Sequence, residues 1–386
     1  KFSNNLSEKK MSSLSLSMAQ KLERRGPDAF GVWSDSSFGI SLSHRRLSIL
    51  DLSDNANQPM ISHNGRFVIV YNGEIYNYLK LKDQLNLNPL DFKSTSDTEV
   101  LLELISKKGL INTLKVVNGI FAFAIWDRKE KKLSVVRDRV GVKPVYIYWD
   151  KKNFAFASEI KSLKTLPWLN FQISKESFAS YVRLNYIPSP YSIYENTLKL
   201  EPGCVYQISQ NKDVSVKKYW DLETSDILNN KTEPSDTHAI LNNAVKSQMI
   251  SDVPLGVFLS GGVDSSLIAA LAQKNSSKKI NSFTIGFDDN NYDEAPYAKK
   301  ISKILGTNHN EVYFNYKDIK NLLNNLPILY DEPFADSSQL PTMLLSQITR
   351  KEVTVALSGD GGDELFGGYY RYFMAEKYQK YIFNQP

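Results

Sequence analysis

A strand, a glycine turn and a helix follow one another at residues 257–271, VFLSGGVDSSLIAAL. Three apolar residues end at Leu259, Gly261 and Gly262 break the run, and apolar residues then return at helical spacing. Glycines allow a tight turn and the close approach of a ligand, and the N–H groups that open a helix attract anions. Ser260, Ser265 and Ser266 add hydroxyl donors. The segment predicts a phosphate-binding loop at the carboxyl end of a strand.

One carboxylate, Asp264, stands among these hydroxyl groups. It would repel bare phosphate, but it suits Mg²⁺, a hard cation that takes carboxylate oxygens. The spacing and the lysine of the G-x-x-x-x-G-K-[ST] phosphate loop are both absent. A merely tight strand–helix turn is the alternative interpretation. The complete SGGVDSS after a strand favours the ligand-binding one.

A second glycine-rich turn, SGDGGDELFGGY at 358–369, follows an apolar run at 353–357. A solvated acidic loop would explain its acids, but not its five glycines or its place after a strand. If the two strand ends are neighbours, Asp264 and Asp363 can share a magnesium ion. That arrangement suits the cleavage of ATP by an electrostatic clamp.

Short β-branched runs alternate with helical patterns throughout the second half of the chain. This alternation predicts an α/β doubly wound parallel sheet. The expected strands are 255–259, 281–287, 310–314 and 353–358, and the expected helices are 237–249, 264–274, 293–305, 317–329 and 338–350.

The first half shows strands, then helices, then strands again, an order that predicts an α+β domain of antiparallel sheets packed with helices. The expected strands are 30–33, 38–43, 47–50, 67–71, 119–127, 132–138, 145–150, 153–159 and a pair near 203–219, and the expected helices are 78–85, 98–107 and 175–186. The polar segment 225–236 contains a proline and is interpreted as a linker. We therefore expect one domain at 1–215 and another at 230–386.

Three segments of the first half are chemically dense: HRRLSILD (44–51), YNGEIYN (71–77) and STSDTEV (94–100). Together they could hold an amino acid, with Arg46 on its carboxylate and Asp97 on its ammonium group. The Asn72–Gly73 turn would supply N–H donors. From the residues alone two alternatives stay open, since Asn-Gly is a common hairpin turn and Asp97 could cap a helix.

Composition excludes several other classes. A net charge of +5 over 386 residues is mild, and no apolar run approaches the length of a membrane span, so neither nucleic acid nor a membrane is an expected partner. One cysteine and four scattered histidines make no zinc-type cluster. Cys204, in LEPGCVYQI, is interpreted as a small buried residue. A single cysteine also fits a reducing, cytoplasmic location.

SGGVDSS resembles the pyrophosphate loop of the N-type ATP pyrophosphatases. Together with SGDGGDELFGGY and YDEPFADSSQLPT (330–342), it resembles the synthetase domain of glutamine-hydrolysing asparagine synthetases. The resemblance implies ATP and Mg²⁺, with Asp360 beside an aspartyl-adenylate intermediate, where the family more often has glutamate. It implies a metal site at Asp264 and Asp363. The implied ATP contacts are Leu259, Ser260, Gly261, Gly262, Asp264, Ser265, Ser266, Ile285, Ser358 and Gly359.

The first half resembles the class II glutamine amidotransferases, an αββα sandwich, through RGPD (25–28), HRRLSI, YNGEIYN, SD (96–97), RDRVGVKPVY (137–146) and FASEIKSL (156–163). The family's nucleophile is an N-terminal cysteine, which stands a little upstream of the position of Lys1, and its members also extend well beyond the last residue here. We therefore expect a fragment truncated at both ends. The resemblance implies glutamine contacts at Arg46, Asn72, Gly73, Glu74 and Asp97, with Asn72 and Gly73 at the oxyanion hole.

These inferences predict an asparagine synthetase that uses glutamine, aspartate and ATP as small-molecule partners, with a homodimer left open. Ammonia from glutamine would be transferred to an adenylated aspartate. A nearby alternative keeps this machinery but aminates another carboxylate, such as a uronic acid of a surface polysaccharide. An alternative of another class is a ligand-binding pseudoenzyme without catalysis.

Overall fold

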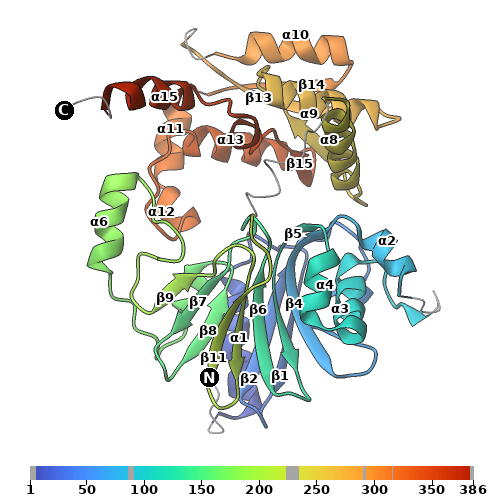
Figure 1. Cartoon of the computed structure of the whole chain (residues 1–386), viewed down its shortest axis with the longest axis vertical. Helices are drawn as coiled ribbons and strands as arrows, with labels where there is room; N and C mark the ends of the chain where they lie inside the picture. The colour runs from blue at the N-terminus through green and yellow to red at the C-terminus, as the bar shows by residue number, and fades with distance from the viewer. Residues whose placement is uncertain (1–5, 86–90, 223–233, 290–292, 315, 383–386) are drawn as a thin grey trace. The chain divides into compact units, whose positions relative to one another are not determined.

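The structure is a computed structural model that describes residues 6–85, 91–222, 234–289, 293–314 and 316–382 (Figure 1). The chain forms two compact units. The first consists of Lys1–Lys231 with Leu326–Asp336, and the second of Thr232–Asn325 with Ser337–Pro386. In the described part of the chain, no helix is both long and apolar enough to cross a membrane.

A six-stranded antiparallel sheet forms the centre of the first unit. Its strand order is β11 (Val214–Lys218), β10 (Cys204–Ser209), β6 (Lys132–Arg137), β5 (Gly119–Asp127), β4 (Phe67–Ile75) and β3 (Met60–Ile61). Two smaller antiparallel sheets accompany it. They are the pair β1 (Ala29–Asp35) and β2 (Ile40–Arg46), and the trio β8 (Phe154–Ala157), β7 (Tyr146–Trp149) and β9 (Thr197–Lys199).

The core of this unit lies between the large sheet and the smaller ones. Trp126 and Val135 from the large sheet pack in one cluster with Leu42 of β2 and with Ile147 and Phe154 of the three-stranded sheet. All five side chains are nearly or fully buried. Burial of large apolar side chains at about 1.5–3 kcal/mol each is what holds the sheets face to face.

Helices cover the outer faces of these sheets, which makes the αββα arrangement that was predicted (Figure 1). Helix α3 (Asp97–Lys108) packs on β4 and is followed by α4 (Leu110–Val116), while α1 (Glu8–Gln20) packs on β1 and β2. The short α2 (Tyr78–Asp83) follows β4, and η1 (Asp54–Ala56) follows β2. Helices α5 (Ile160–Leu163), α6 (Lys175–Leu184) and α12 (Leu326–Leu329) complete the unit.

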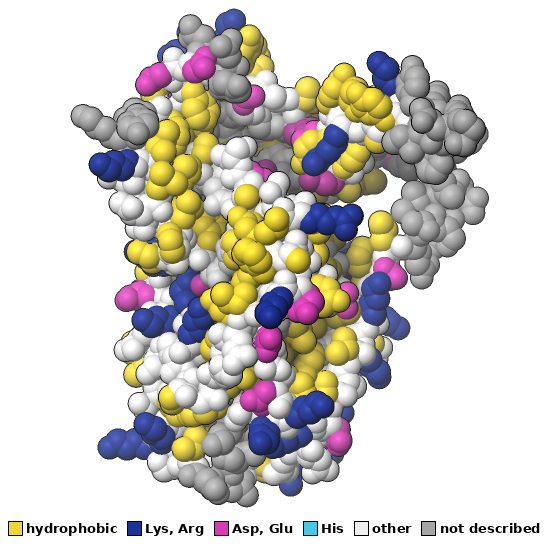
Figure 2. Space-filling model, turned by 90° about the vertical axis from the view of Figure 1, so that its left-hand side faces the viewer, with side chains coloured by type: hydrophobic (Ala, Val, Ile, Leu, Met, Phe, Trp, Pro, Cys, Tyr) yellow, Lys and Arg dark blue, Asp and Glu magenta, His cyan; other side chains and the backbone are white. Residues whose placement is uncertain are grey.

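Helix α6 leaves much of its apolar surface in solvent. Phe178 and Val182 are 52% and 65% exposed. Figure 2 looks onto the side that carries α6 and shows hydrophobic side chains on that face. Only Ser177 is buried along the helix, so few core contacts stabilise it. Its ends are fixed by the Ser174 cap and by the hydrogen bond from the Asn185 amide to the Tyr181 carbonyl.

The second unit contains a four-stranded parallel sheet, as predicted. Its order is β14 (Asn308–Phe314), β13 (Asn281–Phe287), β12 (Leu255–Phe258) and β15 (Val355–Leu357). Its helices are α8 (Pro234–Gln248), α9 (Val263–Lys274), α10 (Ala295–Leu305), α11 (Tyr316–Leu323), α13 (Gln339–Thr349), α14 (Gly362–Phe366) and α15 (Tyr370–Ile382). Val257, Leu259, Ala269 and Ala298 belong to its main buried cluster.

Some local predictions are wrong. The strand expected at 47–50 is a loop, because the Ser48 amide donates to Asp28 and the Arg46 guanidinium binds the carbonyl groups of Leu50 and Asp51. The expected helix 317–329 is divided into α11 and α12. Helix α1 has no counterpart among the predictions.

The Asn72–Gly73 pair is not a turn. Strand β4 runs through it and pairs Asn72 with Ala122 and Gly73 with Phe121. Of the expected linker, residues 225–233 lie outside the described part of the chain, and residues 234–236 begin α8.

Candidate functional site

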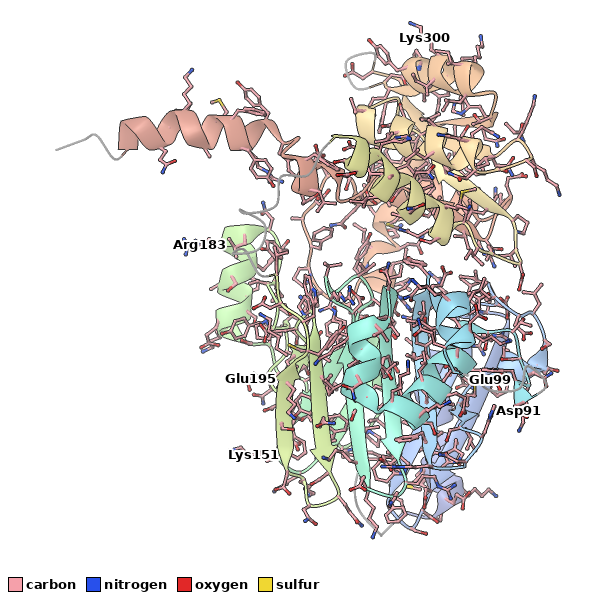
Figure 3. The ribbon with its side chains drawn as sticks, turned by 45° about the vertical axis from the view of Figure 1, so that its right-hand side comes forward. Asp91, Glu99, Lys151, Arg183, Glu195 and Lys300 are labelled. Carbon is pink, nitrogen blue, oxygen red and sulfur yellow. The ribbon has the colours of Figure 1, made fainter. Side chains whose placement is uncertain are left out.

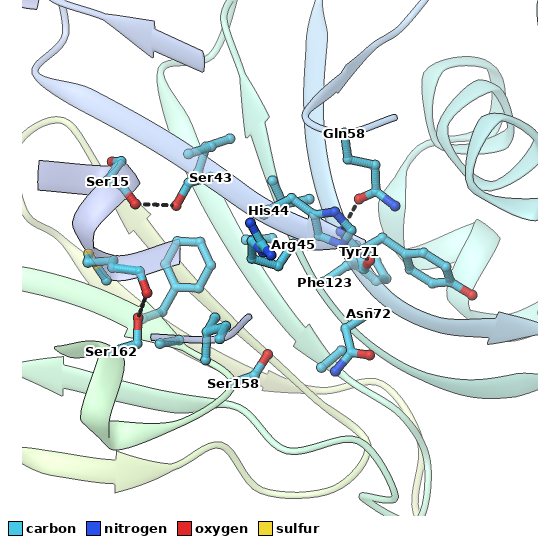
Figure 4. Close-up of a pocket in the computed structure, with 18 of the residues that line it drawn as sticks. Ser15, Ser43, His44, Arg45, Gln58, Tyr71, Asn72, Phe123, Ser158 and Ser162 are labelled. Carbon is cyan, nitrogen blue, oxygen red and sulfur yellow. Dashed lines mark hydrogen bonds between the residues drawn. The ribbon is translucent and has the colours of Figure 1, made fainter. Parts of the chain in front are cut away.

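A cavity of about 490 Å³ lies inside the first unit (Figure 4). Two continuous runs of backbone border it, Gly39–Leu47 from β2 and its flanks and Phe154–Ser158 from β8 and its end. Both are edge strands of their small sheets. The residues expected to contact glutamine, which are Arg46, Asn72, Gly73, Glu74 and Asp97, all line this cavity.

Gly73 lets two strands approach closely at the cavity. A Cβ atom there would lie 2.2 Å from the Ile120 carbonyl oxygen and 2.6 Å from the Phe121 Cα, so only glycine fits. The adjacent Asn72 amide nitrogen Nδ2 is buried and has no hydrogen-bond partner among the described residues. A buried donor without a partner is rare in folded proteins, and a bound ligand would satisfy it.

Asp97 is held by the strand that carries Asn72. Its Oδ2 accepts hydrogen bonds from the Tyr71 hydroxyl at 2.7 Å and from the Ile75 amide at 2.8 Å. Burial raises the pKa of Asp97, and these hydrogen bonds oppose that shift. Ser96 caps α3, since its side chain accepts from the Glu99 amide. Asp97 therefore occupies the first helical turn but is not the cap.

The loop before Asp97 is fixed by a second buried carboxylate, Glu99 (labelled in Figure 3). Glu99 accepts hydrogen bonds from the Lys93 amide, from the amide and hydroxyl of Ser94, and from His63 at 2.8 Å. This web of contacts holds the residues that precede Asp97 in one conformation.

Arg46 is nearly buried and holds the loop that follows β2. One terminal nitrogen donates to the Ser53 carbonyl at 2.9 Å and to Asn57 at 3.0 Å, and the other donates to the Leu50 and Asp51 carbonyls. Burial lowers the pKa of Arg46. With these four acceptors in place, its guanidinium is not a free fork, and a ligand carboxylate would replace some of these contacts.

His44 is a cavity residue to which the sequence analysis gave no role, although it opens the HRRLSI motif. Its Nε2 lies 2.9 Å from the Tyr71 carbonyl oxygen, so Nε2 carries the proton and Nδ1 is an acceptor. Burial lowers the pKa of His44 to about 4, which keeps the ring neutral. Gln58 also binds Tyr71, since its side-chain oxygen accepts a hydrogen bond from the Tyr71 amide at 2.6 Å (Figure 4).

Glu74 titrates near neutral pH. Burial and the nearby charge of Asp97 raise its pKa to about 7, and Lys143 opposes the shift. Burial lowers the pKa of Lys143, which also lines the cavity. The cavity thus combines acidic groups, one amine and one unpaired amide donor, a set that matches the ends of an amino acid.

In the second unit, both glycine-rich turns leave the sheet at one place. Strand β12 pairs with β13 on one side and with β15 on the other, so the strand order reverses between β12 and β15. Ligands of open parallel sheets bind beyond the carboxyl ends of the strands at such a point. SGGVDSS follows β12 and SGDGGDELFGGY follows β15, as the sequence required for a shared site.

The two turns contact each other closely. A Cβ atom at Gly359 would lie 2.9 Å from the Ser265 amide nitrogen and 3.0 Å from the Asp264 Cβ. One at Gly362 would lie 2.5 Å from the Asp264 carboxylate oxygen. Asp264 therefore lies against the residue that precedes Asp363, whose own carboxylate lies beside Gly368.

The hydroxyl groups of the first turn shape its backbone. The Ser260 and Ser265 hydroxyls are 2.9 Å apart, and the Gly262 amide donates to Ser260 at 3.3 Å. The Ser266 hydroxyl is buried and has no partner among the described residues. Helix α9 begins directly after Gly262 without a side-chain cap, so its first amides are available to an anion.

The remaining expected contacts lie around this turn. Leu259 is buried and extends the strand pairing, since its amide donates to the Phe283 carbonyl at 2.9 Å. The Ser358 hydroxyl donates to the Asp360 carboxylate at 2.9 Å, and Asp360 is exposed. Ile285 packs against the hydrophobic cluster that contains Phe314. The expected carboxylates Asp264 and Asp363 fit Mg²⁺, which uses one or two carboxylates together with substrate phosphates, and the described residues contain no cluster of three or more potential metal ligands.

Cys204 is buried in β10, within the core between the sheets, and is not among the residues that line the cavity. The interpretation of Cys204 as a structural residue is confirmed. Burial also raises the pKa of its thiol, which disfavours the reactive thiolate.

The two sites lie in separate units, one built on antiparallel sheets and the other on a parallel sheet. Comparison with known families gives a separate match for each part of the chain. Residues 3–220 match the glutamine amidotransferase domain, and residues 236–385 match asparagine synthase. The chain belongs to the glutamine-hydrolysing asparagine synthetase family.

Curated relatives carry corresponding names. A putative asparagine synthetase [glutamine-hydrolyzing] 2 of Methanocaldococcus jannaschii is 40% identical over 375 residues, which are 91% of this chain and 72% of the relative. Asparagine synthetase [glutamine-hydrolyzing] 1 of Bacillus subtilis is 34% identical over 355 residues, 91% of this chain and 55% of the relative. Amidase chry2 of Gibberella zeae is 30% identical over 369 residues, 90% of this chain and 54% of the relative. The chain thus spans between about half and three quarters of these relatives.

Proposed function

We propose that this chain contributes the glutamine site and the ATP site of a ligase that adenylates aspartate and converts it to asparagine with ammonia from glutamine. The observation that carries the proposal is the contact between the two glycine-rich turns at the strand-order reversal of a parallel sheet. Two such turns at one sheet edge form a cradle for polyphosphate.

The glutamine site would work through groups that are already in place. Asp97 would accept the substrate ammonium, and the Arg46 guanidinium would contact its carboxylate. The unpartnered Asn72 Nδ2 and the main-chain N–H of Gly73 would stabilise negative charge that develops on the side-chain amide oxygen. No cysteine is among the described residues that line the cavity, so we expect this chain to bind glutamine without hydrolysing it.

On the ATP side, the amides that open α9 and the hydroxyls of Ser260, Ser265 and Ser266 would bind the pyrophosphate portion. Asp264 and Asp363 would hold Mg²⁺, which neutralises charge on the phosphates when it is bound. Asp360 would lie near the activated carboxylate, on the loop that follows β15. These roles all depend on the close contact seen between Gly359 and Asp264.

Aspartate is the acceptor that the names of most compared relatives support. Another carboxylate, such as a uronic acid, would use the same ATP machinery. A test of both supplies the full-length gene product with ATP, Mg²⁺, ammonium and either carboxylate, and measures pyrophosphate. Pyrophosphate release with aspartate but not with the uronic acid supports the proposal. Release only with the uronic acid would identify the uronic acid as the acceptor.

Binding to this chain provides the companion test. Calorimetric titration should show separate binding of L-glutamine and of ATP with Mg²⁺. A third outcome would indicate a ligand-binding pseudoenzyme. In that case this chain would bind both ligands, but the full-length gene product would form no pyrophosphate with any carboxylate. Absence of glutamine binding would contradict the proposed amidotransferase site.

A further inference from the structure

Eleven residues of the chain belong to a unit that their sequence neighbours do not share. Leu326–Asp336, here called the tether segment, is part of the first unit, whereas Asn325 and Ser337 on either side belong to the second. The segment contains DEPFAD (331–336), part of the YDEPFADSSQLPT motif, which the proposed function leaves without a role. The chain therefore passes between the units at both ends of the tether segment, in addition to the crossing after Lys231.

Asp331 attaches the tether segment to helix α5. Its Oδ2 accepts hydrogen bonds from the Ile160 and Lys161 amides, which are the first amides of a helix that has no side-chain cap of its own. In return, the Lys161 ammonium donates to the carbonyls of Ile328 at 2.9 Å and Leu329 at 3.1 Å, at the end of α12. Asp331, two residues after α12, thus caps the start of α5, and Lys161 of α5 caps the end of α12.

Glu332 makes a second attachment to a different part of the first unit. It accepts hydrogen bonds from the Ile193 amide at 2.7 Å and from the Tyr146 hydroxyl at 3.0 Å, and it pairs with the Lys199 ammonium at 2.9 Å. The side chains of Asp331 and Glu332 are each only 9% exposed. Buried carboxylates with full sets of donors specify one position of the backbone that carries them.

The attachment is continuous with the wall of the glutamine cavity. Glu159, which precedes α5, pairs with Lys161 at 3.0 Å and with Arg25 at 3.1 Å. Arg25 and Ser158 both line the cavity. A connected set of charged groups therefore leads from the cavity wall to Asp331, five residues before the chain re-enters the second unit at Asp336–Ser337.

We propose that the tether segment couples the two sites, with Asp331 and Glu332 as positioning residues that let occupancy of the glutamine cavity influence the start of α13 in the second unit. This inference rests on the proposed function of the two sites. If the tether segment had a purely structural role, its contacts would only stabilise the first unit. A coupling element also changes how one site responds to the ligand of the other, which is what the test separates.

The test compares the wild-type full-length gene product with the double variant Asp331→Asn, Glu332→Gln, which keeps side-chain shape but removes both charges. Pyrophosphate release driven by ammonium and glutamine hydrolysis without nucleotide should change little. With glutamine as the nitrogen donor, the ratio of glutamate formed to pyrophosphate released should rise at least about fivefold. An unchanged ratio overturns the proposal.

Glu195→Gln is the matched control, because Glu195 is an exposed carboxylate of the same unit (Figure 3). A rise in the ratio for this variant that equals the rise for the double variant would also overturn the proposal. If the double variant does not fold, Tyr146→Phe removes a single hydrogen bond to Glu332 and should raise the ratio in the same direction.

Hydrogen exchange separates failure of this inference from failure of the proposed function. If the wild-type protein hydrolyses no glutamine or releases no pyrophosphate, the proposed function fails, and exchange in this chain then decides the inference. The Ile160 and Ile193 amides and peptides that cover 337–349 should all exchange faster in the double variant than in wild type. Faster exchange confined to the two amides would show that Asp331 and Glu332 only stabilise the first unit. Unchanged exchange would show that they do not position the tether segment at all. Either result overturns the coupling.

Discussion

Gly359→Ala should weaken ATP binding, although it adds only one methyl group. The new Cβ would lie 2.9 Å from the Ser265 amide nitrogen and 3.0 Å from the Asp264 Cβ, whereas ordinary contacts lie between 3.4 and 4 Å. These neighbours are backbone and the base of a side chain, so the two turns must move apart. Overpacking of this kind costs about 1–3 kcal/mol, which corresponds to about a 5- to 150-fold loss of affinity if it falls on the bound state.

The assay is calorimetric titration of ATP with Mg²⁺ into this chain, alongside urea unfolding. Gly367→Ala is the control, since Gly367 lies in the same turn at φ +69° with nothing within 4 Å of its added Cβ. Its cost is backbone strain of about 1–2 kcal/mol, which should lower stability and leave ATP affinity nearly unchanged. Equal ATP affinity for Gly359→Ala and wild type would refute the shared cradle.

Three further outcomes follow from the sites. Asp264→Asn should nearly abolish pyrophosphate release by the full-length gene product and spare glutamine hydrolysis, because the amide lacks the charge that Mg²⁺ needs; unchanged magnesium dependence would make Asp264 a turn residue. Arg46→Lys should weaken glutamine binding in calorimetry and spare ammonia-driven synthesis, since an ammonium cannot replace four contacts to the loop; an equal loss of both would make it purely structural. The pKa of Glu74 is raised from 4.5 to about 7 in the folded state, so the folded protein keeps this proton to a higher pH than the unfolded chain does. The free energy of unfolding should therefore fall by about 1–3 kcal/mol between pH 5 and pH 8. Urea unfolding of Glu74→Gln should show a smaller fall, and an identical pH profile would remove Glu74 as the cause.

The sequence was sufficient where one pattern decides the element. β5 and β13 begin and end where the patterns predict, because each is an apolar run bounded by turn or polar residues. The two glycine-rich turns were predictable as turns because their glycines are close to each other in sequence. The contact between these turns could not be predicted in the same way, because it depends on the pairing of β12 with β15, which neither segment indicates by itself.

Other features depend on long-range contacts that no local pattern contains. Asn-Gly favours a turn locally, yet β5 pairs through Asn72 and Gly73 and keeps them in a strand. The tautomer of His44 is set by its hydrogen bond to the Tyr71 carbonyl, which is 27 residues away in the sequence. Asp331 and Glu332 lie in a recognisable motif, but their partners are far away in the sequence. The Ile193 amide and the Tyr146 hydroxyl are 139 and 186 residues from Glu332.

The central claim is that the second unit activates a carboxylate by adenylation. The most direct measurement supplies the full-length gene product with ATP, Mg²⁺, ammonium and aspartate whose side-chain carboxylate is labelled with ¹⁸O, and follows the label by mass spectrometry. Adenylation transfers one carboxylate oxygen to the α-phosphate, so the account predicts ¹⁸O in AMP and unlabelled pyrophosphate. Label in inorganic phosphate, with ADP as the nucleotide product, would show an acyl phosphate instead and would contradict the account.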